Sequence, residues 1–179
     1  FLEGASHPAE LVEAADEKGL DAIALTDRDG FYGTVEAHSK AEELDIDLIV
    51  GVEVSVRDWG TINLYPMNRE GYGNLCELLS IGQQRTEKGD CWVTWPEVCA
   101  HAGEQLAAWG GDIAWDAYER GDILDVGRRL AEDFGGRLYV MIPRHRLPEG
   151  PANEERLIEL ADELEAPTVA VNEVLYHDI

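Results

Sequence analysis

Two short apolar runs near the start of the chain flank a segment with helical periodicity. The runs are Ala22–Leu25 and Leu48–Val52, and the segment between them is Thr34–Leu44. Both runs are apolar throughout rather than alternating, which is typical of strands that are covered on both faces. A strand, a helix and a second strand joined by short connections predict a βαβ unit with parallel, neighbouring strands.

The same alternation of helical and strand-like patterns continues along the chain. In the first helix-like segment, Val35, Ala41 and Leu44 have helical spacing and predict its buried side. A tight turn is predicted at residues 58–60, and Asn153 is the predicted N-cap of the last helix. Further helices are predicted over residues 5–18, 70–84, 95–102, 123–134 and 154–164, and further strands over residues 62–65, 105–109, 138–142 and 168–171. This alternation predicts an α/β fold with a mostly parallel barrel.

Carboxylates and an imidazole follow several of the predicted strands. Asp27 and Glu53 follow the first two, and His145 and Glu173 follow two later ones. In parallel barrels the C-terminal ends of the strands meet at one mouth, so we expect these side chains to lie together. Such a cluster could hold Zn²⁺, Mn²⁺ or Mg²⁺, which would polarise a phosphate and activate water.

Each of these residues also has a purely structural interpretation, and the pattern alone leaves both open. Asp27 could cap a turn, and Glu53 could be a solvated strand end. His145 stands beside Arg144 and could be a surface histidine, while Glu173 could cap the last strand.

Composition narrows the class of protein. The chain has 179 residues, enough for one domain with a real core, and its 37 acidic against 14 basic residues give a net charge of -23. A surface this acidic repels nucleic-acid phosphates, so we do not expect it to be the main DNA-binding surface. The same composition is typical of a halophilic proteome.

Cysteine content and hydropathy limit the cellular locations that we expect for the protein. The three cysteines have no metal-type spacing, which favours a reduced, cytoplasmic protein. No apolar run approaches ~18 residues, so no membrane span is expected. The chain starts with Phe1, without an initiator methionine or a signal-peptide pattern, which predicts a fragment of a longer protein.

Five segments of the chain carry a resemblance to a known family. They are FLEGASHPAELVEAA (1–15), ALTDRDGFYGTVEAH (24–38), LIVGVEV (48–54), YPMNREGYGNLCELLSIGQQRTEKGDC (65–91) and VAVNEVLYH (169–177). In this order they resemble the polymerase-and-histidinol-phosphatase (PHP) domain at the N-terminus of bacterial C-family DNA polymerases, above all the error-prone branch. The resemblance implies a distorted (β/α)7 TIM-like barrel over residues 1–179. The family's first strand, with its His-x-His pair, would precede Phe1 and is expected to be missing from this chain.

The resemblance also carries over metal positions of the family, residue by residue. Glu53 matches a bridging glutamate, and His145 matches a histidine of some metal-binding members. Glu3 and Glu173 stand where many members have aspartate, and Asn172 precedes Glu173 at the same mouth. The resemblance therefore implies Glu3, Glu53, His145 and Glu173 as the candidate ligands.

Three further positions depart from the family's ligand pattern. Arg28, Thr61 and Leu175 stand where the family often has histidine. Arginine is a permanent cation and cannot serve as an ordinary ligand. Arg28 could instead pair with Glu53 or Glu173 by charge-assisted hydrogen bonds, so that protein rather than metal neutralises the mouth. We therefore expect a degenerate site without a tightly bound metal.

The functional expectation follows from this degenerate pattern. The chain resembles a structural PHP domain that packs on the remainder of an error-prone DNA polymerase, and DNA would be bound by that remainder. A rival interpretation is an active metal-dependent phosphoesterase or 3′–5′ exonuclease that uses Glu53, His145 and Glu173. A third is a histidinol-phosphatase-like enzyme, which the match over residues 72–90 disfavours.

Overall fold

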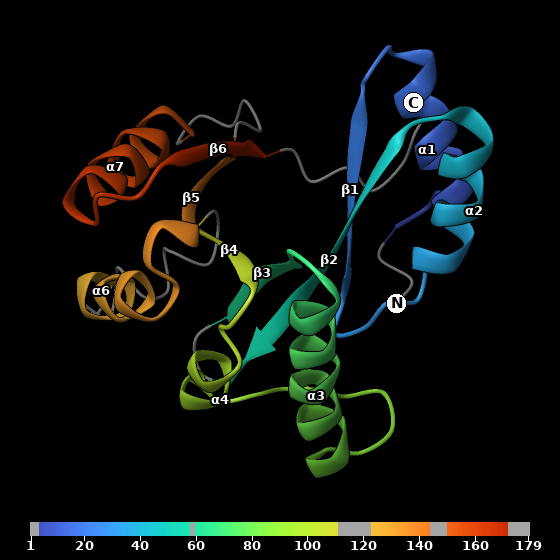
Figure 1. Cartoon of the computed structure of the whole chain (residues 1–179). Helices are drawn as coiled ribbons and strands as arrows, with labels where there is room; N and C mark the ends of the chain where they lie inside the picture. The colour runs from blue at the N-terminus through green and yellow to red at the C-terminus, as the bar shows by residue number, and fades with distance from the viewer. Residues whose placement is uncertain (1–3, 58–59, 111–122, 144–149, 172–179) are drawn as a thin grey trace.

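The computed structural model describes residues 4–57, 60–110, 123–143 and 150–171, which form a curled sheet flanked by helices (Figure 1). The strands in these ranges are β1 (Ala22–Arg28), β2 (Asp47–Val56), β3 (Gly60–Pro66), β4 (Gln105–Gly110), β5 (Leu138–Pro143) and β6 (Thr168–Val171). The helices are α1 (Pro8–Glu17), α2 (Thr34–Leu44), α3 (Arg69–Arg85), α4 (Trp95–Ala100), α6 (Ile123–Phe134) and α7 (Gly150–Glu163), with a 3₁₀ turn η1 (Gly135–Arg137).

The six described strands pair in chain order, from β1 at one edge to β6 at the other. Strands β1 and β2 are parallel, as are β4, β5 and β6. Only β3 among them runs the other way, because it pairs antiparallel with both β2 and β4. The sheet curls into a half-barrel, and this confirms the predicted α/β fold of a mostly parallel, barrel-like type (Figure 1).

The reversal of β3 follows from the tight turn that the sequence predicts after β2. Val56 is paired with Gly60, and Gly60 has a φ of 89°, which a residue with a side chain rarely adopts. The turn residues Asp58 and Trp59 lie outside the described residues. Because β3 runs antiparallel to β2, α3 follows from the opposite rim of the sheet, and its buried leucines share a core with side chains of β2 and β3.

Among the described residues, two hydrophobic cores lie between the sheet and its helices. The smaller core joins α1 and α2 to β1, and its buried members are Val12, Ala15, Ala37, Ala41 and Ile46. The larger core continues from β2 to β5 under α3, α4, α6 and α7. The prediction that Val35 lies on the buried side of α2 is wrong, because its side chain is 77% exposed. The predicted Ala41 is buried and the predicted Leu44 packs against the smaller core, while Ala37 rather than Val35 completes the buried side of α2.

Most helix boundaries agree with the sequence, and the exceptions have local causes. Thr94 and Glu97 form a capping box at the start of α4, in which the Glu97 side chain accepts a hydrogen bond from the Thr94 backbone N–H at 2.7 Å. Asn153 is not an N-cap, because α7 begins at Gly150 and Asn153 lies inside it.

None of the described helices has the length and hydrophobicity that a membrane-crossing helix requires.

Candidate functional site

Strand register separates the two carboxylates that the sequence places at one mouth. Strand β1 runs on to Arg28, which is paired with Glu53, whereas Asp27 is paired with Val52. Since successive side chains of a strand point to opposite faces, Asp27 and Glu53 lie on opposite faces of the sheet. The Asp27 carboxylate faces the helices and accepts a hydrogen bond from the Gly33 backbone N–H at 2.6 Å. Asp27 therefore caps the turn into α2.

Glu53 lies on the inner face of the sheet and is bound to a cation of the protein itself. The Arg28 Nε donates a hydrogen bond to the Glu53 carboxylate at 2.7 Å. Both side chains are only partly buried, with 41% and 22% of their surfaces exposed. The Arg28 guanidinium is thus hydrogen-bonded to one carboxylate oxygen of Glu53, the residue that the family resemblance implies as a metal ligand.

A tyrosine ring packs beside this ion pair on the same inner face. A Cβ atom on Gly51 would lie 2.5 Å from the Tyr65 ring and 2.9 Å from the Thr26 side chain, so a glycine lets the ring lie against β2. Burial raises the pKa of the Tyr65 hydroxyl, a hydrogen bond with Asn63 opposes that shift, and the charge of Glu53 adds to it. Tyr65 therefore lies close enough to Glu53 for the carboxylate charge to act on its hydroxyl.

The remaining predicted site residues are placed only in part. Thr61 is paired with Ser55, two positions along β2 from Glu53, and so lies on the same inner face. Five others lie outside the described residues, and they are Glu3, His145, Asn172, Glu173 and Leu175. Within the described ranges, no group of three or more His, Cys, Asp or Glu side chains is arranged to hold a metal ion.

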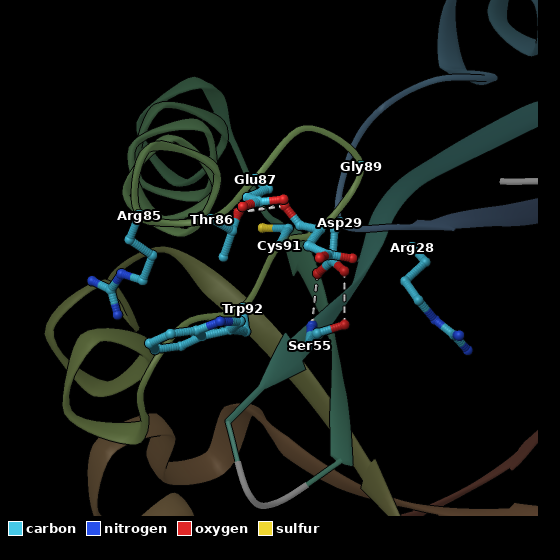
Figure 2. Close-up of a pocket in the computed structure, with 10 residues that line it drawn as sticks. Arg28, Asp29, Ser55, Arg85, Thr86, Glu87, Gly89, Cys91 and Trp92 are labelled. Atoms are coloured by element: carbon cyan, nitrogen blue, oxygen red, sulfur yellow. Dashed lines mark hydrogen bonds between the residues drawn. The ribbon is translucent and has the colours of Figure 1, made fainter.

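A pocket of about 470 Å³ opens beside the ends of β1 and β2, and Asp29 lies in its wall (Figure 2). The Asp29 carboxylate accepts two hydrogen bonds from Ser55, one from its backbone N–H and one from its hydroxyl, both at 2.7 Å. The Asp29 backbone N–H donates to the Glu53 carbonyl at 2.8 Å, and its carbonyl accepts from the Gln83 side chain at 3.2 Å. These contacts tie the connection after β1 to both β2 and α3.

Sequence reasoning missed Asp29, although its position carries a recognisable signal. Asp29 has a φ of 54°, in the left-handed region that Asp, Asn and Gly adopt most readily. An Asp-Gly pair after an apolar strand is a common turn signal. Burial raises the pKa of the Asp29 carboxyl, and the hydrogen bonds from Ser55 oppose that shift.

The far wall of the pocket is built around an arginine. Arg85 forms a two-pronged ion pair with Glu97, and the hydrogen bond from Arg85 lowers the pKa of the Glu97 carboxyl to about 2. The guanidinium groups of Arg57 and Arg85 lie 4.7 and 4.8 Å from the ring centre of Trp92. Burial raises the pKa of the Cys91 thiol to about 11, which keeps it protonated and unreactive near neutral pH. The residues of this wall therefore stabilise the fold, and the Cys91 thiol is not a candidate nucleophile.

We expect Asp29→Ala to lower the free energy of unfolding by about 2 kcal/mol, because it leaves both Ser55 donors without their acceptor. Asp29→Asn keeps one acceptor and the tolerance for a left-handed backbone, so a smaller loss is expected. Urea unfolding measures both changes. Asp90→Ala, at an exposed residue of the same pocket, is the matched control and should change stability by less than about 0.5 kcal/mol. Equal losses for Asp29→Ala and Asp90→Ala would show that the hydrogen bonds between Asp29 and Ser55 do not stabilise the fold.

Comparison with known proteins gives consistent matches along the chain. The family described as the PHP domain matches residues 1–117. An error-prone DNA polymerase of Alkalilimnicola ehrlichii is 37% identical over 177 residues, which are 99% of this chain and 17% of that protein. An error-prone DNA polymerase of Rhodopirellula baltica is 35% identical and is matched over 99% of this chain and 16% of its own length. The chain thus spans about one sixth of these relatives.

A solved structure shows the same fold at low sequence identity. An amidohydrolase from Chromobacterium violaceum superposes with a TM-score of 0.67, over 97% of this chain and 84% of its own. Its sequence identity is 17%, so the likeness concerns the fold alone.

Proposed function

Because the chain belongs to the PHP domain family, we propose that it is the PHP domain of an error-prone DNA polymerase of the bacterial C family. The observation that carries the proposal is the alignment of 99% of the chain with polymerases that are about six times longer. Residues 1–179 then form one domain of a DNA-directed DNA polymerase. The residues that catalyse nucleotide transfer belong to the remainder of that enzyme.

We assign this domain a structural role, with a metal site that has degenerated. The support is the ion pair on the inner face, where Arg28 occupies an oxygen of Glu53. A divalent cation at Glu53 would meet the fixed positive charge of Arg28, which repels it. Thr61, the other described position, offers only a hydroxyl, and neutral hydroxyls are poor ligands for Zn²⁺. The described residues therefore do not fit the family's metal cluster.

The charge of the domain fits a role away from DNA. A net charge of -23 repels nucleic-acid phosphates at low salt. We infer that DNA is bound by the rest of the polymerase and that this domain contacts protein.

Expression of the complete reading frame tests the proposal. Primer extension on an undamaged and a lesion-containing template should show polymerase activity, and Glu53→Gln should leave that activity within about twofold. A complete reading frame without polymerase sequence, or a purified full chain without primer extension, would refute the assignment.

We expect metal analysis of the purified protein to find well under one Zn²⁺, Mn²⁺ or Mg²⁺ per chain, because a catalytic metal needs about three protein ligands. For the same reason, a phosphodiester substrate with added Mn²⁺ or Zn²⁺ should not be hydrolysed. Near-stoichiometric metal, with hydrolysis abolished by Glu53→Gln but not by Glu36→Gln on the exposed side of α2, would favour the exonuclease alternative. Hydrolysis that survives both Glu53→Gln and His145→Ala would come from a contaminant.

A further inference from the structure

Three aromatic or aliphatic residues lie close in sequence where β1 passes into α2, and one of them contacts an aromatic residue of α3. We call these four residues the Phe31 patch, and they are Phe31, Tyr32, Val35 and Tyr72. The rings of Phe31 and Tyr72 lie 4.8 Å apart, which joins the turn to the first part of α3. Tyr32 is 61% exposed, Val35 77% and Tyr72 42%. Figure 1 shows the connection from β1 to α2 passing alongside α3.

Such an apolar surface is unusual for a chain of this composition. With 37 acidic residues among 179, the expected occupant of an exposed first helical turn is a charged or polar side chain. Clustered exposed apolar residues mark interaction sites more often than single ones do, and tyrosine is enriched at the centres of protein interfaces. The Phe31 patch therefore has the composition of a binding surface.

The segment that carries the patch is held at several points. Phe31 packs against the main core, and the turn is fixed by the hydrogen bond from the Gly33 N–H to Asp27. Asp29 is bound to Ser55 on the other side of the same turn. A surface that is already ordered loses little conformational entropy when a partner binds, which favours tight association.

We propose that the remainder of the polymerase chain docks on the Phe31 patch in the complete protein. This inference rests on the proposed function, and the length of the relatives supports it. This chain is 16–17% of each relative, so most of the polypeptide lies outside it and is covalently linked to it. Covalent linkage raises the effective concentration of a docking partner to about the millimolar range.

The alternative occupant, a second copy of the chain, is disfavoured by charge. Each copy carries a net charge of -23, so two copies that approach face to face repel one another. The remainder of the polymerase must bind DNA phosphates and is therefore expected to be more basic, which adds attraction around the apolar contact.

Hydroxyl-radical footprinting of the full-length protein tests the docking directly. Leu20 and Ile158 are internal references, since they are 53% and 43% exposed and lie before β1 and in α7, not at the turn after β1. After correction for intrinsic reactivity, we expect Tyr32 and Val35 to be modified at least about fivefold more slowly than the references, because interface cores exclude water. Equal rates would overturn the proposal. Protection that disappears when the protein is diluted to a monomer would assign the patch to a second copy and would also overturn it.

A charge substitution provides the second test. Val35→Asp places a carboxylate in the first turn of α2, where the helix dipole favours it, so the domain should still fold. In the full-length protein we expect it to speed proteolytic release of residues 1–179 by about tenfold, because a buried unpaired charge opposes docking. The matched control Leu20→Asp should change that rate by less than twofold. An unchanged rate for Val35→Asp, in a protein that still extends primers, would refute the docking but not the proposed function.

Discussion

Replacing Gly71 with alanine is expected to lower the free energy of unfolding by about 3 kcal/mol, a large part of the stability of a domain this size. Gly71 is buried in the first turn of α3. A Cβ atom on it would lie 2.0 Å from the carbonyl oxygen of Glu104 and 2.9 Å from the carbonyl carbon. These are backbone atoms, and the Glu104 carbonyl is also held by the Met67 N–H at 2.9 Å. The added methyl group therefore forces α3 away from the turn before β4.

A glycine two residues further along α3 provides the matched control. Gly73 is exposed, and a Cβ atom on it would meet nothing within 4 Å. Gly73→Ala should therefore stabilise the protein by about 0.5–1 kcal/mol, because alanine restricts the unfolded chain. Urea unfolding of both variants measures these two changes in the free energy of unfolding. Stabilisation by both substitutions would show that α3 and the turn can move apart at no cost.

Phe134→Ala is expected to lower the free energy of unfolding by about 3–5 kcal/mol. Phe134 is the last residue of α6, is 1% exposed and belongs to the main core with Leu130, Leu138 and Val140. Removal of its ring leaves a cavity between α6 and the middle of the sheet. Thermal and urea unfolding measure the loss.

Phe134→Leu tests whether the loss comes from the cavity or whether any substitution at this position destabilises the protein. Leucine keeps most of the apolar volume, so a loss of about 1.5 kcal/mol or less is expected. A loss under about 1 kcal/mol for the alanine variant would mean that the core closes around the missing ring and that α6 is loosely attached.

Local signals in the sequence are sufficient for several elements. Helices α2 and α6 have the predicted bounds, Thr34–Leu44 and Ile123–Phe134. Each ends at a left-handed residue, Asp45 with a φ of 59° and Gly135 with a φ of 56°. Glycine is the usual residue at this position, and Asp tolerates the left-handed region better than most other residues. The βαβ unit is predicted correctly for the same reason, since its pattern and its turns are local.

The site is harder to predict, because it depends on register. The apolar run in β1 ends at Leu25, but hydrogen bonding with β2 continues to Arg28. Those three additional residues decide which face each side chain takes, and they turn Asp27 toward the helices. The pairing of Arg28 with Glu53 was predictable as one of two options, because opposite charges end neighbouring strands. Residues 1–3, 144–149 and 172–179 hold the other candidates, so convergence of the full set stays a prediction.

The cation that Glu53 meets is part of the polypeptide. A guanidinium cannot be chelated, exchanged for another ion or titrated under physiological conditions. The pairing of Arg28 with Glu53 is therefore independent of the cell's supply of zinc or manganese. At this carboxylate, starvation for trace elements leaves the charge unchanged, whereas a site filled by a free ion would empty.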